Sequence, residues 1–126
     1  MAAARRPVVV AICLLVAALH LVTGPDYRGP LRWFVTGYLI DVALPFSLVL
    51  LLGIGFDRIP PLQRPAFRAS AVVLLGAVVE LLQFLGVPIF GRTFDPLDLI
   101  MYAAGALAAV AFERVVFPSS LPPRAR

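Results

Sequence analysis

The sequence predicts an all-α, membrane-embedded four-helix bundle, and three observations support this fold class. Of the 126 residues, 61% are hydrophobic and only 14% are charged, and the mean hydropathy is +0.96. These values are typical of membrane proteins and not of soluble globular domains. The apolar residues gather in four segments, each close to the roughly 20 residues with which a helix crosses a bilayer. No segment shows the alternation, about ten residues long, of a membrane β-strand.

The predicted spans cover about 7–23, 34–56, 69–87 and 97–117. We therefore expect residues 1–117 to form a single transmembrane domain. The tail at 118–126 has too little apolar content to fold, so we expect it to be disordered in the cytoplasm.

The first segment is expected to remain in the protein as a transmembrane helix. Arg5 and Arg6 precede an apolar core, as in a secretory signal peptide, but the exit near Pro25 lacks the small-residue pattern of a cleavage site. Cys13 is the single cysteine, so it forms no intramolecular disulfide, and we interpret it as a packing residue. His20 is interpreted as an interfacial residue.

The second segment combines a carboxylate with a proline. Because Pro45 has no N–H, it cannot bond to the carbonyl of Asp41, and a kink should free that oxygen about two turns inside the membrane. The free carbonyl and the Asp41 carboxylate would suit a cation or a polar headgroup. A kink solvated by neighbouring helices is an equal alternative.

The third segment, which Pro65 can start, carries Glu80 and Gln83 on one helical face. A charge in hydrocarbon costs about 2.5–3.5 kcal/mol or more, so such residues usually face other helices and mark a site. Glu80 lies mid-helix and has no capping role. We interpret it as a site residue rather than a buried structural hydrogen bond, and Gln83 as its partner or as a link between helices.

The fourth segment begins with Asp95, Pro96 and Asp98, which is the pattern of a capped helix start. We interpret Asp95 mainly as the N-cap, whereas capping and ligand binding are equally open for Asp98. Tyr102 follows Asp98 by one turn on the same face. If the third and fourth helices are neighbours, Arg92 lies in the loop between the two polar faces, where it could neutralise the carboxylates or hold an anionic group.

Gly105 and Ala109 have the spacing that lets another helix approach closely. Packing within the chain is the default interpretation of these small residues. A homo-oligomer formed through the same face is the alternative.

The arginines predict the orientation in the membrane. All eleven basic residues are Arg, and most flank the N-terminus, the second loop and the C-terminal end, whereas Arg28, Arg32 and Arg92 lie in the other two loops. The positive-inside rule then places both termini in the cytoplasm of a multi-pass protein in the bacterial inner (plasma) membrane. The singled-out polar residues fall in the outer half of the bundle. We expect no comparable polar set in the inner half.

Composition also bears on partners. The net charge is +4, but the arginines stand in ones and twos beside apolar segments, so we expect no nucleic-acid binding. With one His and one Cys, the sequence predicts no metal site, and it predicts no cofactor. Membrane lipids are the expected surroundings.

The ordered set Glu80-x-x-Gln83, Arg92, Asp95, Asp98 and Gly105 resembles the VanZ-like family of small bacterial membrane proteins, and most of all its short four-span members. The resemblance covers about 80–109. Where that family often has an Asn, four residues after the second Asp, this chain has Tyr102, so an amide role is not carried over. The resemblance implies a cell-envelope protein, and the family's founding member is linked to resistance to the glycopeptide teicoplanin.

Three functions are compatible with these residues. We expect a binding protein whose outward-facing pocket holds a lipid headgroup, a cell-wall precursor or a cation, with ligand-binding residues Glu80, Gln83, Arg92, Asp95, Asp98, Tyr102 and Asp41. One alternative is an enzyme on a lipid-linked substrate that uses Glu80 and Asp98 as acid and base, although no nucleophile is evident. The other is an accessory subunit of a membrane complex, in which the carboxylates only fix helix registry.

Overall fold

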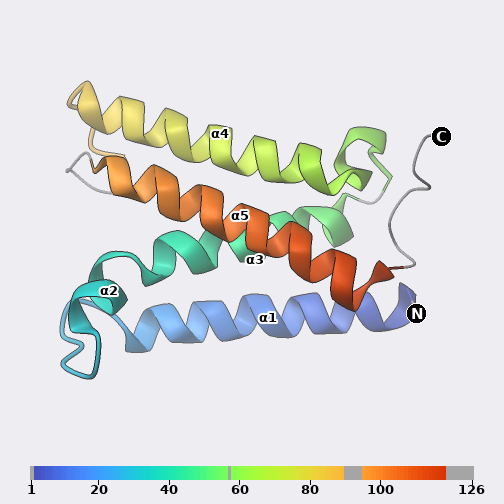
Figure 1. Cartoon of the computed structure of the whole chain (residues 1–126), viewed down its shortest axis with the longest axis horizontal. Helices are drawn as coiled ribbons and strands as arrows, with labels where there is room; N and C mark the ends of the chain where they lie inside the picture. The colour runs from blue at the N-terminus through green and yellow to red at the C-terminus, as the bar shows by residue number, and fades with distance from the viewer. Residues whose placement is uncertain (1, 57, 90–94, 119–126) are drawn as a thin grey trace.

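The computed structural model of the chain describes residues 2–56, 58–89 and 95–118. This part of the chain is all-helical and contains no strand, so the predicted all-α class is confirmed. Its long helices lie side by side (Figure 1). In chain order the elements are α1 (Ala2–Val22), α2 (Arg32–Gly37), α3 (Leu39–Gly55), the 3-10 helix η1 (Pro60–Gln63), α4 (Pro65–Phe84) and α5 (Pro96–Val116).

Helices α1, α4 and α5 are each long and apolar enough to cross a membrane, whereas α3 is apolar but shorter. The outward faces of these helices are covered with exposed aliphatic side chains, such as Leu15 and Leu21 of α1, which are 70% and 85% exposed. A soluble monomer rarely exposes such a surface. The structure therefore supports a membrane protein, with three helices of spanning length where the sequence predicts four.

The second predicted segment is not one helix. Over 34–56 the sequence predicts an unbroken span, but the chain breaks at Tyr38, which ends α2 and precedes α3. Two features favour the break: Gly37 is a poor helix former, and the Tyr38 ring is held by Trp33, with ring centroids 5.2 Å apart. As a result α3 begins at Leu39 and is too short for a full span.

Helix α4 begins at Pro65, as the sequence predicts, and ends at Phe84, a few residues earlier than expected. Gly86 explains this end because it adopts a φ of 82°, the left-handed conformation that terminates helices. The amide of Val87 then bonds back to the carbonyl of Leu82, which closes the turn.

Small residues bring α3 and α5 together. A Cβ added to Gly105 would overlap the carbonyl oxygen of Val42 and lie 2.9 Å from Cγ of Pro45. Gly105 and Ala109 are both buried. Packing within the chain, the default interpretation, is therefore what the structure shows, and we assign no homo-oligomer to this face.

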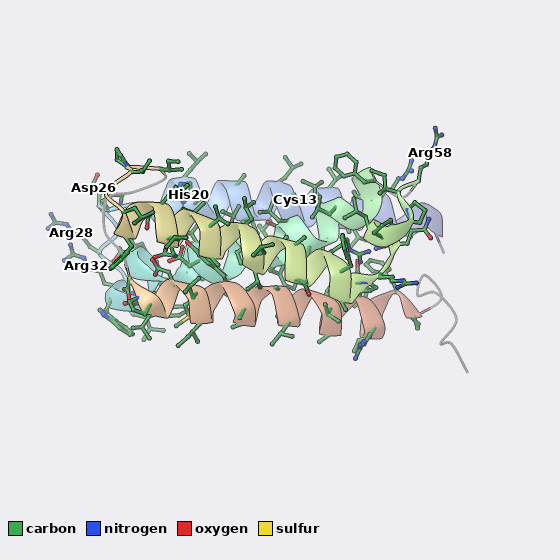
Figure 2. All side chains as sticks on the ribbon, turned by 90° about the horizontal axis from the view of Figure 1, so that it is seen from above. Cys13, His20, Asp26, Arg28, Arg32 and Arg58 are labelled. Carbon is green, nitrogen blue, oxygen red and sulfur yellow. The ribbon has the colours of Figure 1, made fainter. Side chains whose placement is uncertain are left out.

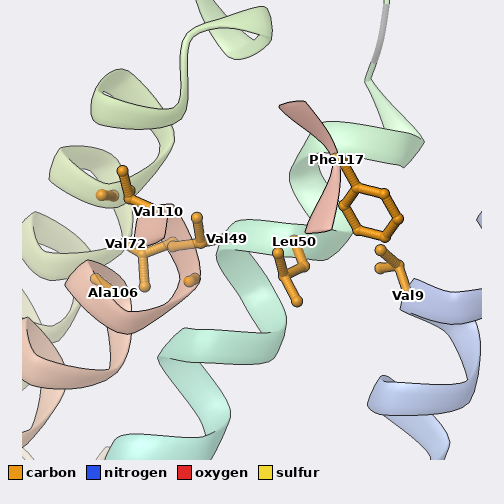
Figure 3. Packing of buried hydrophobic residues seen from close by; sticks show 9 residues of the cluster. Val9, Val49, Leu50, Val72, Ala106, Val110 and Phe117 are labelled. Carbon is orange, nitrogen blue, oxygen red and sulfur yellow. The ribbon is translucent and has the colours of Figure 1, made fainter. Parts of the chain in front are cut away.

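The apolar core joins all four long helices. Val49 and Leu50 of α3 are fully buried and pack with residues of α4 and α5, whereas Val9 of α1 lies beside Phe117 at the end of α5 (Figure 3). Ile12 and Cys13 of α1 also pack against this core, which agrees with a packing role for the cysteine.

Candidate functional site

Predicted site residues from three helices lie at one end of the molecule, where α3 and α5 begin and α4 ends. Asp41 and Asp98 lie in the first turns of α3 and α5, and Glu80 lies near the end of α4. Asp41, which the sequence predicts to lie well inside a longer helix, is instead in the first turn of α3 because the chain breaks at Tyr38. His20 is exposed at the end of α1 (Figure 2).

We call Asp41, Glu80, Asp98 and Tyr102 the acidic cluster. The side chain of Asp98 lies close to those of Asp41 and Glu80, and the hydroxyl of Tyr102 lies close to Asp41. Glu80 is 1% exposed, and the other three side chains are partly buried.

The acidic cluster has no cationic side chain paired with it in the described part of the chain. The ion pairs there that involve Arg5 and Arg68 both go to Glu113, at the opposite end. Arg92, which the sequence predicts to lie between the carboxylates, falls outside the described residues. An acidic cluster with no cationic partner can bind a proton or a positively charged ligand.

Asp95 lies beside the cluster but is used by the protein itself. One carboxylate oxygen accepts the backbone N–H of Leu97 at 3.0 Å, so Asp95 caps α5 as predicted. The other accepts the hydroxyl of Tyr38 at 2.8 Å, and the Asp95 backbone N–H donates to Glu80 at 3.3 Å. Asp95 therefore joins the α2–α3 break to the start of α5 and positions Glu80.

Gln83 does not orient Glu80 through a hydrogen bond, contrary to one of its predicted roles. Its side-chain N–H donates to the carbonyl of Ile89 at 2.9 Å, which stabilises the chain after α4. Its side-chain oxygen is buried and has no hydrogen-bond partner.

An apolar cavity of about 220 Å³ adjoins the acidic cluster between α3, α4 and α5. Tyr102 belongs to both features, because its hydroxyl interacts with Asp41 while its ring lines the cavity. The ring lies against the backbone of Gly76, where an added Cβ would come within 2.5 Å of Cδ2. The other lining residues include Leu44, Leu48, Val72 and Leu75.

The opposite end of the molecule contains a second buried charged set, contrary to the prediction that no comparable set exists there. Glu113 of α5 is fully buried and accepts hydrogen bonds from Arg68 of α4 and, at 2.6 Å, from Arg5 of α1. Arg68 also donates to the carbonyls of Val49 at 3.0 Å and Leu62 at 2.6 Å. We call Arg5, Arg68 and Glu113 the charged triad.

The sequence contains a signal for this triad. Glu113 lies inside an apolar segment near its C-terminal end, and such a carboxylate needs a cation. Arg5 and Arg68 each stand beside an apolar segment, and that position alone predicts a membrane flank and not a buried partner. Gly53 makes room for both guanidinium groups, because an added Cβ there would lie 2.6 Å from Arg5 and 2.9 Å from Arg68.

In the described part of the chain, no group of three or more His, Cys, Asp or Glu side chains is arranged to hold a metal ion. No protein-family model, curated protein or solved structure matches this sequence.

Proposed function

We propose that this chain is an integral membrane protein whose acidic cluster binds the positively charged amine of a polar ligand. The observation that carries the proposal is the meeting of Asp41, Glu80 and Asp98, from three helices, without an ion pair in the described residues. Because water is scarce among the helices, a cation there gains more from the carboxylates than it would in bulk solvent.

An ammonium group suits this site by its hydrogen bonding. It presents three N–H donors and no acceptor, and the cluster presents carboxyl oxygens from α3, α4 and α5. Among the ligands expected from the sequence, this favours a headgroup or a cell-wall precursor that carries an amine.

We also propose the cellular setting in which the site works. The distribution of arginines supports a bacterial plasma-membrane protein with both termini in the cytoplasm, which puts the acidic cluster on the outer side. The residues between 80 and 109 support a VanZ-like protein of the cell envelope. In this setting the cluster would be within reach of lipid headgroups and of envelope precursors.

The proposal is tested by ligand-observed NMR on the protein in phosphatidylcholine nanodiscs, with ethylamine as the probe and ethanol as its neutral counterpart. Saturation transfer to ethylamine, and not to ethanol, is expected with the parent protein. Asp98→Asn should abolish the transfer because it removes the carboxyl that joins Asp41 to Glu80.

Asp26→Asn is the matched control, since Asp26 is an exposed carboxylate at the same end of the molecule (Figure 2). This variant should bind ethylamine as the parent does. Equal transfer in Asp98→Asn and the parent would refute the proposal. If Asp98→Asn instead fails to fold, the carboxylates serve helix registry, and the accessory-subunit alternative is favoured.

A further inference from the structure

The cavity beside the acidic cluster indicates what the rest of the ligand is. We infer that the ligand is a membrane lipid with an amine headgroup, an inference that rests on the proposed amine site. The part of the lipid chain nearest the headgroup would occupy the apolar cavity between α3, α4 and α5. The amine would lie at the acidic cluster, and the hydrocarbon would run past the ring of Tyr102.

Tyr102 connects the two parts of this site. Its hydroxyl interacts with Asp41, and its ring forms part of the cavity wall against Gly76. The charged part and the apolar part of the site are therefore separated by one aromatic side chain. A ligand that filled both parts would need a polar end and an apolar body in direct succession, which is the chemistry of an amphiphile.

The size and lining of the cavity fit hydrocarbon. Its volume is about 220 Å³, and its walls are aliphatic except for Tyr102. For comparison, an apolar cavity of roughly 150 Å³ is enough to bind benzene, whereas drug-sized ligands occupy about 300–1,000 Å³. The cavity therefore suits a short segment of an alkyl chain and not a whole lipid.

The rim of the cavity gives access from the membrane. Leu44 of α3 and Leu75 of α4 line it and are 46% and 58% exposed. In a bilayer this outer surface of the helices contacts lipid, so a lipid chain could enter sideways while its headgroup stays at the level of the acidic cluster. Charge complementarity then selects among lipids, because the carboxyls repel anionic headgroups and attract amines.

Photolabelling tests this inference. The protein is placed in phosphatidylcholine nanodiscs with a long-chain alkylamine that carries a diazirine close to the amine, or with the matched alkyl alcohol. Crosslinked residues are mapped by mass spectrometry. We expect the amine to label the walls of the cavity on α3 and α4 at least fivefold more than the alcohol does. Phosphatidylethanolamine added to the nanodiscs should compete with this labelling.

Cavity-filling variants separate the inference from the proposed function. Leu48→Trp should reduce cavity labelling by the alkylamine several-fold and leave ethylamine binding unchanged, whereas Asp98→Asn should abolish both. Leu75→Trp fills the same cavity from α4 and replaces Leu48→Trp if that variant does not fold. Leu107→Trp, on an exposed position of α5 outside this cavity, is the control and should label like the parent.

The outcomes differ for the two proposals. Ethylamine binding with equal cavity labelling by amine and alcohol would overturn the lipid inference and leave the amine site in place. Labelling that persists in the filled variants, or that phosphatidylethanolamine does not reduce, would overturn it as well. If ethylamine bound no better than ethanol and the alkylamine labelled no more than the alkyl alcohol, both the amine site and the lipid inference would be refuted.

Discussion

Glu113 shows how one residue can stabilise several helices. Its two carboxylate oxygens accept from different arginines, one from α1 and one from α4, and Arg68 extends the contacts to the backbone of α3 and of η1. Burying these charges is costly, but each is met by an opposite charge or a carbonyl. The guanidinium of Arg5 also lies 5.9 Å from the ring centroid of Phe117.

Glu113→Gln is therefore expected to destabilise the fold strongly. The substitution removes the charge that balances Arg5 and Arg68 and directs an amide N–H₂ at a guanidinium donor. Removing one partner of a buried ion pair typically costs about 3–5 kcal/mol. Unfolding of the purified protein by increasing SDS, followed by circular dichroism, measures the effect. Arg114→Gln, at the exposed neighbouring position, is the control, and equal midpoints for the two variants would show that the triad contributes no stability.

Helix α3 has an interrupted start and an internal proline, and α5 packs closely against it. It begins only after the break at Tyr38 and contains Pro45, which cannot donate to the carbonyl of Asp41. In the same part of α3, α5 comes close, with Gly105 against the carbonyl of Val42. The position of α3 relative to α5 thus also sets the distance between Asp41 and Asp98.

Gly105→Ala should push these two helices apart. The added methyl group would meet backbone and not a flexible side chain, so relief requires a helix shift, and overpacking of this kind typically costs about 1–3 kcal/mol. Thermal unfolding in detergent measures the loss of stability. Gly55→Ala is the matched control because a Cβ there meets nothing within 4 Å, and it should be neutral or stabilising. If Gly105→Ala were as stable as Gly55→Ala, the close approach would be unimportant.

Over the whole molecule, the described charged side chains gather toward the two ends, and the middle is apolar. Asp26, Arg28 and Arg32 lie at one end and Arg58 at the other (Figure 2). The ends differ in the sign of their buried charge: the acidic cluster lies at the first, and the charged triad, with two arginines for one glutamate, at the second.

The orientation can be measured with single cysteines in a Cys13→Ala background. A membrane-impermeant maleimide applied to intact cells should label Asp26→Cys and not Arg58→Cys, because the arginine-rich flanks keep the second loop inside. Labelling of Arg58→Cys after the cells are opened shows that this site is reactive. The reverse pattern in intact cells would invert the topology and place the acidic cluster on the cytoplasmic side.

The sequence by itself determined the helical class, the membrane character and most helix positions. These follow from local properties: apolar runs of spanning length, Pro65 and Pro96 at helix starts, and Asp95 as a cap. It also singled out Asp41, Glu80 and Asp98, because a charge in an apolar segment is costly and therefore conspicuous. Whether these three side chains meet in space depends on how each helix is rotated about its axis, which the sequence does not specify.

Only the tertiary structure decided which polar residues meet and which charges compensate each other. The break at Tyr38 involves Asp95, 57 residues away, and the triad joins Arg5 to Glu113 across 108 residues. Neither contact can be predicted from periodicity, because helical periodicity shows which residues share a face of a helix but not which helix packs against that face. The sequence therefore predicts that Arg68 flanks a membrane span, whereas in the fold it is a buried ion-pair partner. Desolvation and packing, rather than position along the chain, determine its role.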